Sequence, residues 1–357
     1  MKLARQLQGL TAAELARDLG VSGPRVSQLE RDGSPTDELT FRLATALQVP
    51  AAFLYLPDPV VVEEGEIHMR HRARTRASEK ALLEVYCSLV AEAVRSIRTR
   101  LGELAIIAQA DIPRIPVEDA PPDEMESVAR QVRRAWGLTD GPIPDLVGLL
   151  EEKGVWVHRL PDTLRDVDAC SLWVEGEAHV FLVPEARDAE GDRFSLGHEC
   201  LHLVGHGGVV TGTRQTEAQA NRFSGAFLVP ASAWLAEAPD ATAPEAYVAG
   251  SRRWRVSVAA LIRRSYDLGI LDDDRYRSAM IRLSMGGYRR DEGHLRGASI
   301  AEQPRRVVSL LHHAANAGIS TDELLGDLAL PDNVRTALTG GNAQRVPGRV
   351  VPFRLRR

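Results

Sequence analysis

Two histidines four positions apart carry the clearest chemistry in this 357-residue sequence. His198 and His202 belong to the run FSLGHECLHLVGHGG, and residues with this spacing project from one face of an α-helix. Neutral imidazoles placed in this way can bind one tetrahedral Zn²⁺, and Glu199 stands where a carboxylate can act as a general base. The pattern therefore predicts two metal ligands and one catalytic carboxylate.

A third protein ligand is needed to complete such a site, and two residues compete for the role. His206 lies one turn beyond His202, but the glycines around it predict that the helix ends there. Glu217 opens a second predicted helix, TEAQANRFSGAFLVP, and shares a polar stripe of that helix with Asn221. We expect Glu217 to be the third ligand, and we expect Asn221 and His206 to orient the ligands or to stabilise an oxyanion.

A predicted β-hairpin precedes the histidine-containing helix. Its strands, 171–175 and 178–183, flank a glycine-containing turn. An extended peptide can add to the edge of such a hairpin as a further strand. From that edge Asp168 and Ser171 could orient ligands or substrate, and His179 is a further candidate for stabilising an oxyanion.

Short amphipathic helices are predicted for the first 56 residues. Thr11 and Glu14 have the spacing of a capping box, and Thr36 follows a proline as a second helix cap. Gly20 separates two of the predicted helices, where a tight turn needs a small residue. Two short helices joined in this way and held by further helices form a helix-turn-helix.

The segment LTAAELARDLGVSGPRVSQLERDGSPTDELTFRLATALQVP resembles the Cro/repressor-type helix-turn-helix family over nearly its whole length. The resemblance implies a recognition helix at 22–31 that presents Arg25, Gln28 and Arg31 to a DNA groove, and Arg and Gln suit guanine and adenine edges. Basic and acidic residues balance over positions 1–50, six against six, so we expect modest DNA affinity unless the basic run at 69–76 or a dimer partner adds charge. A protein-interaction domain is the alternative interpretation.

The two chemistry-bearing helices, GDRFSLGHECLHLVGH and TEAQANRFSGAFLVP, resemble the ImmA/IrrE family of zinc peptidases. The resemblance spans about 124–230 and implies that His198, His202 and Glu217 bind zinc while Glu199 acts as the base. Cys200 departs from the family pattern, in which a smaller or aliphatic residue is usual. Members of this family cleave repressor-like DNA-binding proteins and so relieve repression in stress responses, mobile elements or phage defence.

Hydrophobic periodicity and proline content predict the remaining elements. We expect a linker at 57–66, a helix at 78–106, a proline-rich break at 110–123, helices at 124–136 and 144–153, and a strand at 155–160. Beyond Pro230 the chain is expected to be helical. Residues 254–284 fit either a helical subdomain that covers the active site, which we favour, or a second helix-turn-helix.

Together these patterns predict an α+β protein of four parts. They are an all-α helix-turn-helix DNA-binding domain at 1–56, a helical connector at 67–120, a mixed α+β zincin-like peptidase core at 121–230, and a helical C-terminal region with a basic tail at 231–357. The expected activity is that of a Zn²⁺-dependent, site-specific metallo-endopeptidase that cleaves a repressor-like transcription factor. One alternative is a DNA-binding regulator whose peptidase-like domain serves as a sensor or dimerisation module; another is a peptidase that acts on its own helix-turn-helix.

Composition excludes several classes of protein. A net charge of −5 gives no general attraction to nucleic acid, and no run of about 18 uncharged apolar residues predicts a membrane span. The N-terminus lacks the apolar core of a secretory signal, and three scattered cysteines do not make a disulfide framework. We expect a cytoplasmic protein whose partners are a repressor-like substrate and double-stranded DNA bound through 1–56, with a homodimer as an open alternative.

Overall fold

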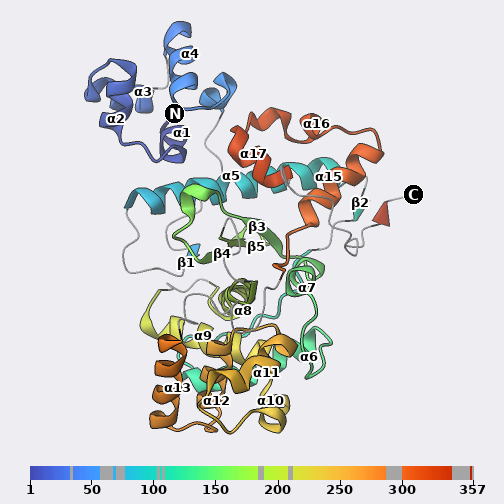
Figure 1. Cartoon of the computed structure of the whole chain (residues 1–357). Helices are drawn as coiled ribbons and strands as arrows, with labels where there is room; N and C mark the ends of the chain where they lie inside the picture. The colour runs from blue at the N-terminus through green and yellow to red at the C-terminus, as the bar shows by residue number, and fades with distance from the viewer. Residues whose placement is uncertain are drawn as a thin grey trace.

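The computed structural model describes residues 1–32, 35–56, 67–69, 77–102, 105–106, 109–183, 189–207, 212–286, 300–339 and 354–355. The expected linker at 57–66, the arginines of the basic run and most of the basic tail lie outside the described residues. The described elements form successive layers: the N-terminal helices, the long helix α5 (Ala77–Leu101), a small sheet, the helix α8 (Ala189–Gly205) and a further group of helices (Figure 1).

The N-terminal module consists of short helices, as predicted. They are α1 (Lys2–Leu7), α2 (Ala12–Leu19), α3 (Gly23–Asp32), α4 (Asp37–Ala46) and the 3₁₀ turn η1 (Ala51–Tyr55). Thr11 and Glu14 form a complete capping box at α2, and the hydroxyl of Thr36 caps α4. Gly20 ends α2 in the left-handed conformation, with a φ of 66°, which glycine adopts without steric cost. The predicted caps and turn are confirmed.

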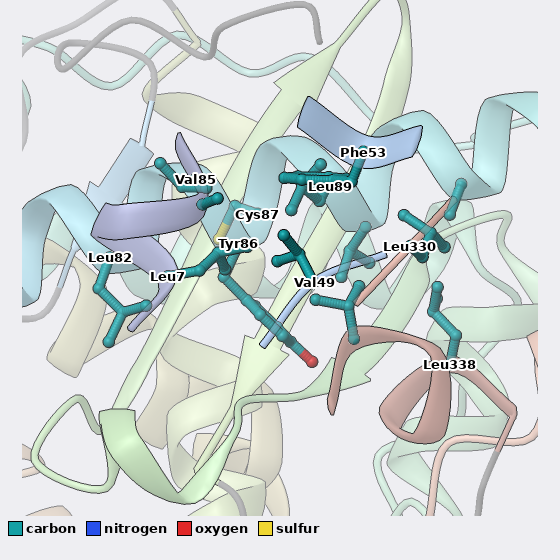
Figure 2. Packing of buried hydrophobic residues seen from close by; sticks show 14 of the residues in the cluster. Leu7, Val49, Phe53, Leu82, Val85, Tyr86, Cys87, Leu89, Leu330 and Leu338 are labelled. Atoms are coloured by element: carbon teal, nitrogen blue, oxygen red, sulfur yellow. The ribbon is translucent and has the colours of Figure 1, made fainter. Parts of the chain in front are cut away.

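Helix α5 joins this module to the rest of the chain through one hydrophobic core. Figure 2 shows that Leu7 and Phe53 of the module lie against Val85 and Leu89 of α5. The helix ends at Leu101, five residues before the predicted end at 106, and the residue that follows is a glycine, which has a low helix propensity. The chain continues instead into the short strand β2 (Ala105–Ile106), which pairs with β6 (Arg354–Leu355).

A four-stranded sheet lies beneath α5, in the order β1-β4-β5-β3. The predicted hairpin is confirmed as β4 (Ala169–Val174) and β5 (Glu177–Leu182), and the predicted strand β3 (Trp156–Arg159) pairs parallel with β5. The fourth strand, β1 (Ile67–Met69), pairs antiparallel with β4 and was not expected from the sequence.

The two faces of the sheet belong to different hydrophobic cores. Leu172 and Phe181 pack with α5, whereas Val180 packs with residues of α8, as the twofold periodicity of a strand requires. The sheet therefore separates the core shared with the N-terminal module from the core that surrounds α8.

Further helices surround α8, and most of them lie on the side opposite the sheet (Figure 1). They are η2 (Pro122–Glu124), α6 (Met125–Ala135), α7 (Leu146–Glu152), α9 (Arg214–Leu228), α10 (Ala231–Glu237), η4 (Pro244–Tyr247), α11 (Val248–Trp254), α12 (Val258–Asp267) and α13 (Asp273–Met285). The predicted helices at 124–136 and 144–153 correspond to α6 and α7, and the proline-rich stretch before η2 contains no helix, as expected. The turn η3 (Asp162–Leu164) connects β3 to β4.

The C-terminal region, which we expected to be helical, contributes to both cores. Helices α10 to α13 pack with α9, whereas α15 (Arg306–Asn316), α16 (Thr321–Leu325), η5 (Gly326–Leu328) and α17 (Asp332–Thr339) return to the layer of α5. Leu330 and Leu338 lie in the same cluster as the N-terminal module (Figure 2). Within the described part of the chain, no helix has the length and apolar character needed to cross a membrane.

Candidate metal centre

The predicted histidine pair lies on α8, between the sheet and α9. The side chains of His198 and His202 are fully buried, and their ring centroids lie 4.9 Å apart. The two Nε2 atoms are separated by 3.2 Å and point toward a common position. The helical spacing predicted from the sequence thus brings two imidazole nitrogens to one site.

Helix α9 brings Glu217 to the same position. The carboxylate Oε2 of Glu217 lies 3.5 Å from Nε2 of His198, and one ligand atom from each of His198, His202 and Glu217 lies within 4.8 Å of the others. The second carboxylate oxygen, Oε1, is buried and has no hydrogen-bond partner within the described residues. Two nitrogens and an unsatisfied carboxylate fit a bound Zn²⁺, which prefers such donors.

The approach of α9 to α8 depends on a glycine. A Cβ atom at Gly197 would lie only 2.6 Å from the hydroxyl oxygen of Ser224, closer than side-chain atoms can pack. The same hydroxyl donates a hydrogen bond of 2.8 Å to the carbonyl of Phe194 and so ties α9 to α8. This close contact sets the distance across which Glu217 reaches His198.

Asn221 determines which nitrogen of His198 carries the proton. Its Oδ1 lies 3.1 Å from Nδ1 of His198, and an amide oxygen can only accept. His198 therefore carries its proton on Nδ1, and Nε2 keeps its lone pair for a metal ion.

A longer chain of hydrogen bonds determines the tautomer of His202. The amide nitrogen of Gln219 donates to the carbonyls of Val117 and Ala120 at 2.6 and 2.7 Å, so its oxygen must face the other way. That oxygen accepts from Nε2 of His206 at 2.9 Å, which leaves Nδ1 of His206 as an acceptor. Nδ1 of His202 lies 2.8 Å from this Nδ1 of His206 and must therefore donate, so Nε2 of His202 keeps its lone pair.

His206 therefore contacts the nitrogen of His202 that faces away from the shared position, and it orients His202 rather than acting as the third ligand. It is fully buried rather than at the surface, and burial lowers its pKa, which favours the neutral ring that this chain of hydrogen bonds requires. Sequence reasoning missed Gln219, because its acceptors lie about a hundred positions earlier in the chain and no local pattern links them.

Glu199 points toward the sheet and is held by Ser171. The serine hydroxyl donates a hydrogen bond of 2.6 Å to Oε2 of Glu199, and both side chains are fully buried. Ser171 belongs to β4, and this contact agrees with the expectation that Ser171 orients residues of the site from the hairpin. The carboxylate lies next to His198 in the helix without joining the cluster of His198, His202 and Glu217.

The expectation for His179 is corrected by the structure. His179 lies on the α5 face of β5, opposite the face that packs against α8, and its Nδ1 contacts Nε2 of His158 at 3.2 Å. Burial holds the pKa of His179 well below its usual value. The period of two along β5 places Val180, not His179, on the α8 side, so His179 cannot stabilise an oxyanion at this centre.

The three predicted DNA-contacting residues share the exposed face of α3. Arg25, Gln28 and Arg31 are all exposed, whereas Val26 and Leu29 are buried. Nη1 of Arg25 donates to Oε1 of Gln28 at 2.8 Å, so the two side chains form one polar surface. The arginines at 70–76, which we expected to add charge, lie outside the described residues.

Comparison with known families supports both parts of this description. Residues 150–266 match the family model described as the IrrE N-terminal-like domain, and residues 1–54 match a helix-turn-helix family. The first match continues past residue 230 through α10 and α11 into α12. A search of curated proteins found no match to the chain. The chain therefore combines a helix-turn-helix of the Cro/repressor type with an IrrE/ImmA-like domain, which is the architecture that the sequence resemblance implied.

Proposed function

We propose that this protein is a zinc-dependent, site-specific endopeptidase joined to a DNA-binding helix-turn-helix. The observation that carries the proposal is the pair of Nε2 lone pairs of His198 and His202, which face one another beside the unsatisfied carboxylate of Glu217. Two lone pairs at this distance repel each other, and a cation between them removes the repulsion. A helix without a metal site would have no need for this arrangement.

The residues around the site have separate tasks in this proposal. His198, His202 and Glu217 hold the metal, and Zn²⁺ in such a site supplies Lewis-acid activation of water and of the substrate carbonyl. Glu199 accepts the proton of the attacking water and passes it to the leaving amine. Ser171 orients the carboxylate of Glu199 by its hydrogen bond of 2.6 Å.

A repressor-like transcription factor is the substrate class that we propose. The support is the IrrE/ImmA-like match over 150–266 together with a helix-turn-helix in the same chain. The exposed face of α3 would bring the protein to DNA, where such a substrate is found. Cleavage of the substrate would then relieve repression in a stress, mobile-element or defence response.

The decisive experiment compares the zinc-loaded protein with its Glu199→Gln variant. We expect about one Zn²⁺ per chain in both proteins, because a general base is not a ligand. Cleavage of repressor-like proteins encoded beside this gene should fall by about 10²–10⁴-fold in the variant. Elemental analysis measures the metal, and mass spectrometry of the products measures cleavage.

Two results would contradict the proposal. A folded Glu199→Gln protein without metal would show that Glu199 is a ligand and that its assigned role is wrong. A zinc-loaded parent that cleaves none of these proteins, yet binds DNA in a metal-dependent manner, would favour the alternative of a regulator whose peptidase-like domain acts as a sensor.

A further inference from the structure

The outer edge of β4 is the sheet edge that lies along the proposed metal centre. Ser171 of β4 contacts Glu199 at 2.6 Å, and Nε1 of Trp173 donates to the carbonyl of Leu203 at 3.2 Å. At the other edge of the sheet, β3 contacts α15 and α17. The other side of β4 pairs with β5, so an extended peptide that hydrogen-bonds directly to the strand that holds Glu199 must use this outer edge of β4.

The chain's own strand β1 occupies that edge. Ile67–Met69 pair antiparallel with β4, and His68 lies directly opposite Ser171. The backbone of β1 thus runs past the serine that holds the proposed catalytic carboxylate. In sequence, β1 lies between η1 of the helix-turn-helix module and α5, so three residues of the segment that connects the two parts occupy the edge.

We propose that β1 is an internal occupant of the peptide-binding edge, and that an extended segment of a protein substrate must displace it. This inference rests on the proposed peptidase function. The strand is three residues long, so only a few backbone hydrogen bonds, each of modest net strength, hold it to β4. A longer peptide strand can make more such bonds along the six residues of β4, and so it can compete successfully with β1.

Weakening β1 should open the edge to a peptide supplied in solution. The double variant Ile67→Pro/His68→Pro removes two successive N–H groups, and because successive N–H groups alternate in direction, one of them would point toward β4. The matched control, Val61→Pro/Val62→Pro, places the same two prolines in the same connecting segment but outside β1. Both are made in the full chain with Glu199→Gln, so that binding is measured without cleavage.

The probe is a fluorescent peptide with the sequence of residues 64–72, EGEIHMRHR, and binding is followed by anisotropy. We expect the β1 variant to bind it at least about tenfold more tightly than the parent and the control, because the internal competitor is lost. Equal binding by all three proteins overturns the inference. A β1 variant that dimerises without binding the peptide also overturns it, because the freed edge then pairs with a second copy.

A disulfide lock between β1 and β4 tests the same point without weakening β1. Met69 lies opposite Cys170, and directly opposed residues have Cβ atoms about 4.5–5.5 Å apart, close enough for a disulfide after a small adjustment. Met69→Cys is made with Cys87→Ser, because Sγ of Cys87 lies 4.0 Å from Sγ of Cys170 and would compete. Oxidised glutathione should close the lock and abolish peptide binding, and reduction should restore it to the level of the parent.

The lock also separates this inference from the proposed function. With Glu199 present, oxidation should reduce cleavage of the repressor-like substrate, and reduction should restore it. Suppose that neither the oxidised nor the reduced protein cleaves any substrate, but the peptide still binds only when β1 is weakened. The peptidase proposal is then wrong, whereas the inference that β1 occupies the peptide-binding edge is supported. If the disulfide forms and peptide binding is unchanged, the inference is wrong.

Discussion

At the scale of single residues, the centre depends on groups that never touch the proposed metal. The carbonyls of Val117 and Ala120 orient Gln219, which sets the tautomer of His206 and through it that of His202. Such residues hold a ligand in the right protonation state, whereas a true ligand supplies a bond to the metal. The two kinds of residue should therefore respond differently to substitution.

Glu217→Ala should remove most of the zinc, because it deletes one of three protein ligands. His206→Ala should leave about one zinc per chain but weaken the affinity by about 10–100-fold, as expected for a residue that orients a ligand. Gln215→Ala, at an exposed position in the first turn of α9, serves as the control. Elemental analysis gives the stoichiometry, and titration against a chelating dye gives the affinity. Loss of zinc in His206→Ala with retention in Glu217→Ala would reverse the assignment.

At the scale of elements, the geometry of the centre depends on how closely α8 and α9 pack. Gly197 allows this approach, and Ser224 secures it through the carbonyl of Phe194. The ligands come from both helices, so a change in the distance between the helices moves Glu217 relative to His198. The contact between Gly197 and Ser224 therefore helps to set the geometry of the proposed metal site, although neither residue is a ligand.

Gly197→Ala should destabilise the fold by about 1–3 kcal/mol, the usual effect of overpacking, and should weaken zinc binding. The second change Ser224→Ala should recover part of the loss, because it removes the oxygen that the new Cβ would meet at 2.6 Å. Gly225→Ala is the matched control on α9, since its Cβ would meet only Arg264 Cδ at 3.8 Å. Urea unfolding with and without zinc measures both effects. Indistinguishable behaviour of Gly197→Ala and Gly225→Ala would show that this contact does not position Glu217.

At the scale of the whole molecule, the helix-turn-helix module is packed into the protein rather than suspended from it. Its residues Leu7 and Phe53 share one core with α5 and with Leu338 near the C-terminal end of the described chain (Figure 2). Helix α5 covers one face of the sheet whose other face packs on α8 (Figure 1). Any DNA contact made by α3 is therefore made by a module with a defined position relative to the proposed active site.

DNA binding should divide into a part that depends on charge and a part that depends on sequence. Replacing Arg70, Arg72, Arg74 and Arg76 by alanine should weaken binding to all duplexes and flatten the salt dependence, because residues 1–50 carry no net positive charge. Gln28→Ala should reduce discrimination between sites, because its side chain lies on the exposed face of α3.

Fluorescence anisotropy at low salt measures these effects, with duplexes of varied sequence. If no duplex binds with a Kd below about 10⁻⁴ M, the weak limit of ordinary non-specific binding, the module does not read DNA. Its exposed face would then be a docking surface for a protein partner, which was the other interpretation of residues 1–56.

Much of this architecture was predictable because its signals are local. Caps such as Thr11 and Thr36 act within three or four residues, and the hairpin of β4 and β5 needs only a short turn between two apolar runs. The spacing of His198 and His202 places both rings on one helical face in any fold that keeps the helix. The order of the helices and the residues of the candidate metal centre follow from such patterns.

The tertiary structure decided everything that depends on which distant surfaces meet. Strand periodicity shows that His179 and Val180 face opposite ways, but only the packing of α5 and α8 determines which of them faces the metal centre. The tautomer of His202 depends on carbonyls about a hundred residues away, and the pairing of β1 with β4 joins segments equally far apart. Such contacts form through burial and backbone hydrogen bonding in the folded chain, and no short-range pattern in the sequence records them.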